Sequence, residues 1–162
     1  MEWNTEYYRR NLPHIGAYDR PMFITFGTKR RRRLPPCARN LVLERCVFGH
    51  LKHYWLHVVV VMPDHVHLVL TIPTGPGGLA WKAIMKAMKG TAARAVNKLL
   101  GSGGIVWQPE SFDRVIRSGK ETETIDYILE NPVRAGLVER WEKYPWTWIP
   151  AQTGMSALHV SR

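Results

Sequence analysis

The chain of 162 residues carries 23 lysines and arginines against 13 acidic residues, a formal net charge of +10, and its isoelectric point lies near 10.0. This length fits one domain with its own core, and the 45% of hydrophobic residues excludes disorder for the chain as a whole. The positive excess predicts attraction to a polyanion, with nucleic acid as the first candidate and an anionic membrane surface as the second.

Membrane insertion and secretion are both disfavoured. No apolar segment approaches the roughly 20 residues that a membrane-spanning helix needs. The first six residues, from Met1 to Glu6, lack the basic-then-apolar pattern of a secretion signal. Cys37 and Cys46 have no motif spacing, so we expect both to be reduced cysteines of one helix.

The first convincing strand covers residues 22–26, which are rich in β-branched and aromatic side chains. A basic run follows at once: Lys29, Arg30, Arg31, Arg32 and Arg33. Such a run is often only a solvated loop, but beside a strand of so basic a chain we favour a loop that contacts phosphates. The next helix is expected to begin at Pro35-Pro36 and to end at Gly49-His50.

Two further strands, residues 53–62 and 65–72, flank a tight turn. Four consecutive valines favour extended chain, and proline in the turn interrupts the ladder of hydrogen bonds. Because side chains alternate along a strand, His65, His67 and Val69 share one face. Neutral imidazole is a common metal ligand, although a bare pair of histidines also arises often by chance. The pair therefore predicts a metal site only if other residues join it.

The second half of the chain begins with a long helix, residues 79–100, whose polar side is basic and includes Lys89. Two short extended pieces, residues 105–108 and 112–117, are expected around Pro109.

A further helix is expected over residues 121–131, stopped by Asn131-Pro132, because a residue before proline is driven out of the helical region. On this helix Tyr127 and Asn131 are four residues apart and share one face. The aromatic end of the chain is expected to pack in the core rather than to stack on bases; its members are Trp141, Tyr144, Trp146 and Trp148.

Two segments resemble a known family. Residues 61–68 resemble the His-hydrophobic-His motif of single-tyrosine transposases of the IS200-like class. Residues 126–138 resemble the tyrosine helix of the branch associated with repetitive extragenic palindromes (REP). Shorter segments follow the same pattern, at residues 12–15, 23–26, 88–90, 107–108, 112–113 and 144–146. The similarity suggests one catalytic domain over residues 1–148 and a flexible tail over 149–162.

Three positions depart from the pattern of the family. Asp64 stands where asparagine is common, and Arg114 stands where the REP-associated branch commonly has histidine. Asn131 stands where other members of the wider class carry a glutamine metal ligand, so an amide oxygen remains on a shorter arm.

The resemblance implies an α+β fold, a ferredoxin-like α/β sandwich with a central antiparallel sheet, of the His-hydrophobic-His (HUH) endonuclease type. It implies a prokaryotic, cytoplasmic and nucleoid-associated transposase that cleaves single-stranded DNA near hairpin-forming, palindromic repeats, as a monomer or a homodimer. Tyr127 would form a 5′-phosphotyrosine, and one Mg²⁺ or Mn²⁺ would be held by His65, His67 and Asn131. The candidate DNA contacts are Lys29, Arg30, Arg31, Arg32, Arg33, Lys89 and Arg117.

Two other functions compete with this one. The first is a domesticated, non-catalytic protein of the same fold that only binds DNA hairpins. The second is a metal-dependent phosphoesterase of small substrates in which Tyr127 is structural. The intact set of candidate site residues argues against the first, and the basic charge argues against the second.

Overall fold

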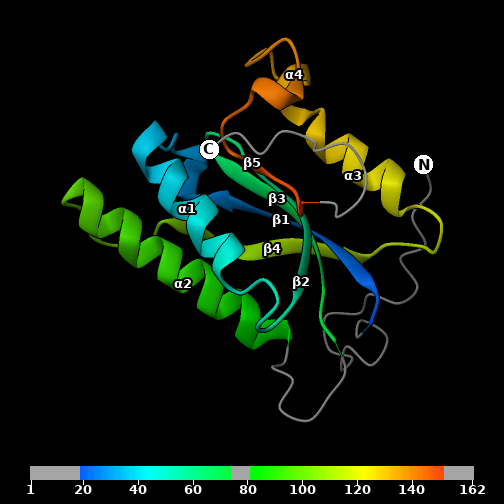
Figure 1. Ribbon diagram of the computed structural model, residues 1–162. Coiled ribbons are helices and arrows are strands. Elements are labelled where there is room, and N and C mark those ends of the chain that lie inside the picture. The colour runs from blue at the N-terminus through cyan, green and yellow to red at the C-terminus, as the bar shows by residue number, and fades with distance from the viewer. Residues whose placement is uncertain (1–18, 74–80, 152–162) are drawn as a thin grey trace.

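A five-stranded antiparallel sheet forms the centre of the computed structural model, which describes residues 19–73 and 81–151 (Figure 1). Its strand order is β4-β1-β3-β2-β5. The strands are β1 (Pro21–Thr28), β2 (Trp55–Val61), β3 (His65–Thr71), β4 (Trp107–Val115) and β5 (Thr147–Trp148). This architecture confirms the predicted α+β class with a central antiparallel sheet.

Helices cover both faces of the sheet (Figure 1). The first face packs against α1 (Pro36–Phe48) and α2 (Trp81–Leu100), and the second packs against α3 (Glu121–Leu129). Three short helical turns complete the fold: η2 (Lys29–Arg31), α4 (Asn131–Arg134) and η3 (Trp141–Lys143).

The alternation of side chains along β3 divides them between two cores. Val66, Leu68 and Leu70 lie in the core beneath α1 and α2. Val69 lies in the other core, together with Ile128 and Leu129 of α3. Because His65 and His67 have the same parity as Val69, all three side chains share one face, as the sequence predicted, and this is the face that α3 covers.

Residues around Pro109 form one strand, β4, where the sequence predicted two short extended pieces. Proline cannot donate to a ladder, but β4 is an outer strand with a partner only at β1 in the described sheet. The register with β1 also shifts between Phe26 and Thr28, which relaxes the pairing near the proline.

The predicted helix over residues 121–131 is instead two helices. The first, α3, ends at Leu129. The second, α4, begins at Asn131 and has Pro132 in its first turn, a position where proline is tolerated. The proline therefore starts a new helical turn as well as ending the old helix.

The aromatic end of the chain packs as predicted. Tyr144 is buried, and its hydroxyl donates to the carbonyl of Val61 at 2.8 Å. The indole of Trp146 donates to Asn40 at 2.7 Å. These hydrogen bonds join the segment that carries Tyr144 and Trp146 to β2 and α1.

Some predictions fall on residues outside the described ranges, namely the motif at residues 12–15, the start of the long helix at 79–80, and the end of the tail from 152 onward. Within the described ranges, no helix has the length and apolar character to cross a bilayer.

Candidate catalytic site

His65 and His67 turn their Nε2 atoms toward each other, 3.1 Å apart. The other ring nitrogen of each histidine is held by a hydrogen bond. Nδ1 of His65 lies 2.6 Å from Oδ1 of Asp64, and Nδ1 of His67 lies 2.7 Å from the hydroxyl of Thr25. Both imidazoles are thus oriented with their Nε2 atoms at one point on the α3 face.

This arrangement fits a divalent metal ion. Two ligand atoms about 2.1 Å from an ion, at about 90° to each other, lie about 3.0 Å apart. Hydrogen bonds that fix the outer nitrogens are typical of metal-binding histidines. Among the residues that the structure describes, no three His, Cys, Asp or Glu side chains form a metal-binding group.

His67 is held in the neutral form that binds metal. Burial lowers its pKa to about 3, and electrostatic interactions with His65 and Arg134 act in the same direction. The ring of Phe23 stacks on it, with centroids 5.8 Å apart. The imidazole is therefore available as a ligand at neutral pH.

Asp64 connects the histidine pair to the basic run. Burial alone would raise the pKa of its carboxyl, but the hydrogen bonds and charges of His65 and Arg31 outweigh burial and lower that pKa. Arg31 Nε donates to Asp64 Oδ2 at 2.8 Å. Arg30 and Arg31 adopt positive φ angles of 56° and 58°, rare for residues with side chains, in the tight turn that carries this guanidinium.

Tyr127 lies on the helix that covers the same face of the sheet as the histidines. Its side chain is 52% exposed, so a substrate can reach the phenol. Its carbonyl accepts hydrogen bonds from Asn131 Nδ2 at 3.4 Å and from Arg134 at 2.8 Å. The guanidinium of Arg134 also lies 4.2 Å from the centroid of the Tyr127 ring. The structure thus keeps Tyr127 and Asn131 together, as predicted, and adds Arg134.

The strands beside β3 bring further residues to this face. Thr25 of β1 pairs with His67 on one side and with Phe112 of β4 on the other. One step along the same face, Arg114 pairs with Phe23, and its guanidinium lies 5.0 Å from the Phe23 ring centroid.

Sequence reasoning missed the role of Thr25, because strand register decides which residue faces His67. It also passed over Arg134, although this residue belongs to the segment that resembles the tyrosine helix.

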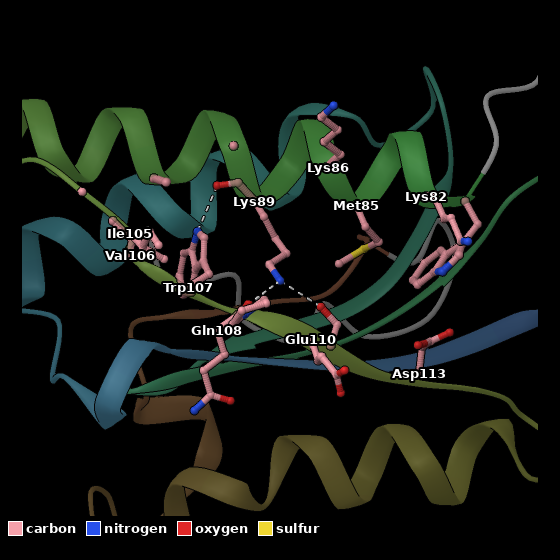
Figure 2. Close-up of a pocket in the computed structure, with 16 residues that line it drawn as sticks. Lys82, Met85, Lys86, Lys89, Ile105, Val106, Trp107, Gln108, Glu110 and Asp113 are labelled. Atoms are coloured by element: carbon pink, nitrogen blue, oxygen red, sulfur yellow. Dashed lines mark hydrogen bonds between the residues drawn. The ribbon is translucent and has the colours of Figure 1, made fainter. Parts of the chain in front are cut away.

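Gly27 lies close to another polar side chain on this face. It lies opposite His65 across the β1–β3 ladder. A Cβ at Gly27 would lie 3.6 Å from the side-chain oxygen of Gln108, which points away from α2 (Figure 2). The amide of Gln108 is therefore a neighbour of this face that the sequence did not single out.

The predicted DNA contacts fall into separate places. The run from Lys29 to Arg33 is exposed and adjoins the turn before His65, where Leu34 N donates to the carbonyl of Pro63 at 2.6 Å. Arg117 is exposed just beyond β4.

Lys89 lies on the opposite side of the sheet, on α2. Its ammonium donates to the carbonyl of Gln108 at 3.0 Å and to Ser111 at 3.1 Å (Figure 2). It lines a pocket of about 670 Å³ between α2 and β4. The structure thus does not bring Lys89 together with the histidine pair.

Comparison with known proteins identifies two curated relatives. The chain is 31% identical over 145 residues to a REP-associated tyrosine transposase of Escherichia coli K12, covering 86% of this chain and 80% of that protein. It is 29% identical over 108 residues to a putative REP-associated tyrosine transposase of Haemophilus influenzae, covering 59% and 60%. No family model matches the chain.

A solved structure has the same fold. It is described as a REP-associated tyrosine transposase bound to a REP hairpin. It superposes with a TM-score of 0.67 at 22% identity and covers 93% of this chain and 94% of its own. At this identity the likeness establishes the shared fold.

Proposed function

Because the chain belongs to the family of REP-associated tyrosine transposases, we propose that it is a metal-dependent single-stranded DNA endonuclease and strand transferase. Its substrate is DNA next to hairpin-forming repeats, and its reaction passes through a 5′-phosphotyrosine. One observation carries the proposal: the helix of Tyr127 packs on the sheet face to which His65 and His67 turn their converging nitrogens.

The protein ligands of the ion would be His65 and His67, with the side-chain oxygen of Asn131 as the third. Two imidazoles and one amide leave coordination positions for oxygen, which suits Mg²⁺ or Mn²⁺ better than a closed zinc site. When bound, the ion would draw negative charge from a phosphate oxygen. Asp64 and Thr25 keep the two imidazoles oriented for this task through their hydrogen bonds.

Tyr127 is the nucleophile in this proposal. Its Oη forms a bond to phosphorus while the bond from phosphorus to the 3′ oxygen breaks. The phenol proton passes to water, and the departing oxygen takes up a proton to become a 3′-hydroxyl. Because the adduct retains the energy of a phosphodiester, another 3′-hydroxyl can attack it and join a new strand. The exposure of the phenol supports this role.

Replacement of Tyr127 by Phe tests the nucleophile. We expect the unmodified protein, incubated with Mn²⁺ and single-stranded DNA that carries the flanking repeats, to give a covalent protein–DNA band on a denaturing gel. Tyr127→Phe should give no such band and should still bind the hairpin, because only the hydroxyl is removed. Equal cleavage by both proteins would refute the assignment. No adduct from the unmodified protein, with binding intact, would favour a non-catalytic hairpin-binding protein.

The histidines are tested separately. His65→Ala and His67→Ala should each abolish Mn²⁺-dependent adduct formation, since each removes one of two converging nitrogens. Calorimetric titration with Mn²⁺ should show weakened ion binding in both variants. Full activity in both variants would remove the metal site from the proposal.

A further inference from the structure

We propose that Arg114 and Arg134 form a binding site for the phosphodiester that Tyr127 attacks. The inference rests on the proposed function, whose other residues bind an ion and form the covalent bond. These two arginines come from different elements, β4 and α4. Arg134 contacts Tyr127, and Arg114 packs on Phe23, which stacks on His67.

Arg134 contacts Tyr127 directly. Its guanidinium stacks over the phenol ring with 4.2 Å from Cζ to the ring centroid, and one terminal nitrogen donates to the carbonyl of Tyr127 at 2.8 Å. A guanidinium has five N–H donors, so this bond leaves donors that can reach a phosphate oxygen.

Arg114 lies on β4 and pairs with Phe23, whose side chain is on the sheet face that α3 covers. Its guanidinium lies 5.0 Å from the ring centroid of Phe23 and 5.5 Å from that of Phe112. Phe23 in turn stacks on His67. Arg114 is therefore held by aromatic packing beside the histidine pair.

The chemistry of the two side chains suits a phosphodiester. Guanidinium groups bind phosphate oxygens through paired hydrogen bonds, and partial burial strengthens such bonds by excluding water. A nucleophile that attacks phosphorus needs the phosphate held beside it, in line with the leaving oxygen. Arg134 at the Tyr127 ring and Arg114 beside the histidine pair meet this need.

The test measures binding rather than cleavage. In a Tyr127→Phe background, a single-stranded repeat oligonucleotide is made with a neutral methylphosphonate at one linkage at a time, and each affinity is measured by fluorescence anisotropy. Neutralising the linkage that lies beside position 127 should weaken binding about tenfold, the value of a charge-assisted hydrogen bond. Adding Arg114→Gln and Arg134→Gln should weaken binding to unmodified DNA and abolish the penalty at that linkage.

Matched variants make the result interpretable. Arg94→Gln removes an exposed arginine from α2, on the other face of the sheet, and should leave the penalty unchanged. Arg114→Lys and Arg134→Lys keep a positive charge and should restore part of the penalty, which guards against a loss of packing around Phe23.

Two outcomes would overturn the inference. One is unchanged affinity for unmodified DNA in both Arg114→Gln and Arg134→Gln. The other is a loss of affinity on neutralising the same linkage that persists when both substitutions are combined. Because no bond is cleaved in this assay, its failure is distinguishable from a failure of Tyr127 as nucleophile, which the adduct assay reports.

Discussion

Asp64 shows how one residue adapts the site of this chain. The carboxylate bridges His65 and Arg31, at 2.6 Å and 2.8 Å. A carboxylate that accepts from Nδ1 fixes the ring and makes the opposite nitrogen a better electron donor. Asp64 thus orients His65 and connects it to the basic run.

Loss of the Asp64 carboxylate should therefore weaken ion binding. We expect Asp64→Ala to reduce the affinity for Mn²⁺ by about 10- to 100-fold, the usual effect of removing such a partner. Isothermal titration calorimetry measures this directly. Glu44→Ala, which removes an exposed carboxylate from α1, is the matched control and should bind Mn²⁺ as the parent does. Equal affinities in the two variants would contradict the role of Asp64.

At the level of residues, the sequence predicted the candidate catalytic and ligand residues better than the residues that orient them by hydrogen bonds. Strand alternation placed His65 and His67 on one face, and helical spacing placed Asn131 near Tyr127. Thr25 could not be found in this way, because its contact with His67 depends on the register between β1 and β3, which joins residues 42 positions apart. Pairing across a sheet leaves no periodic signal in one strand.

Among the elements, the connection between α1 and β2 depends on a glycine. A Cβ at Gly49 would lie only 2.5 Å from the ring of Tyr54, which is buried and donates from its hydroxyl to the carbonyl of Cys46. The contact between the end of α1 and the residue before β2 therefore requires glycine at position 49.

We expect Gly49→Ala to lower the free energy of unfolding by about 2 kcal/mol, the usual cost of overpacking a core. Urea unfolding followed by circular dichroism measures this change. Gly103→Ala is the matched control, because a Cβ there would meet no atom within 4 Å. A Gly49→Ala protein as stable as the control would show that Tyr54 can shift at little cost.

The sequence located most elements but not every boundary. Hydrophobic patterns placed β1, α1, β2, β3 and α2 close to their observed bounds. They failed at Pro109 and Pro132, because a proline constrains its own residue while the surrounding residues decide whether a strand or helix forms there. Pro109 lies in an outer strand, and Pro132 lies in a first helical turn, where the missing donor costs little.

Across the whole molecule, the net charge of +10 is distributed unevenly around the candidate site. The exposed run from Lys29 to Arg33 lies beside the turn that precedes His65, and Arg31 contacts Asp64 directly. Cations that bind phosphates release counterions from the DNA. The slope of log affinity against log salt therefore reports how many phosphates the protein neutralises.

We expect Arg32→Gln with Arg33→Gln to reduce the slope of log affinity against log salt by about 1.4 for single-stranded DNA, or about 0.7 for each phosphate that is no longer neutralised. Anisotropy titrations over a range of NaCl concentrations measure this slope. Arg94→Gln with Lys98→Gln removes the same charge from α2 and should leave the slope nearly unchanged. Equal slopes in the two double variants would show that net charge, and not this run, attracts DNA.

The position of Pro109 in the outer strand has a consequence for solubility. An outer strand of a β-sheet offers unpaired amides to which a strand of another molecule can add, and this is a common route to aggregation. In β4 the ring of Pro109 replaces one such amide, and the charged Glu110 follows it. Within the described sheet, we therefore expect Pro109 and Glu110 to disfavour the addition of another strand at β4.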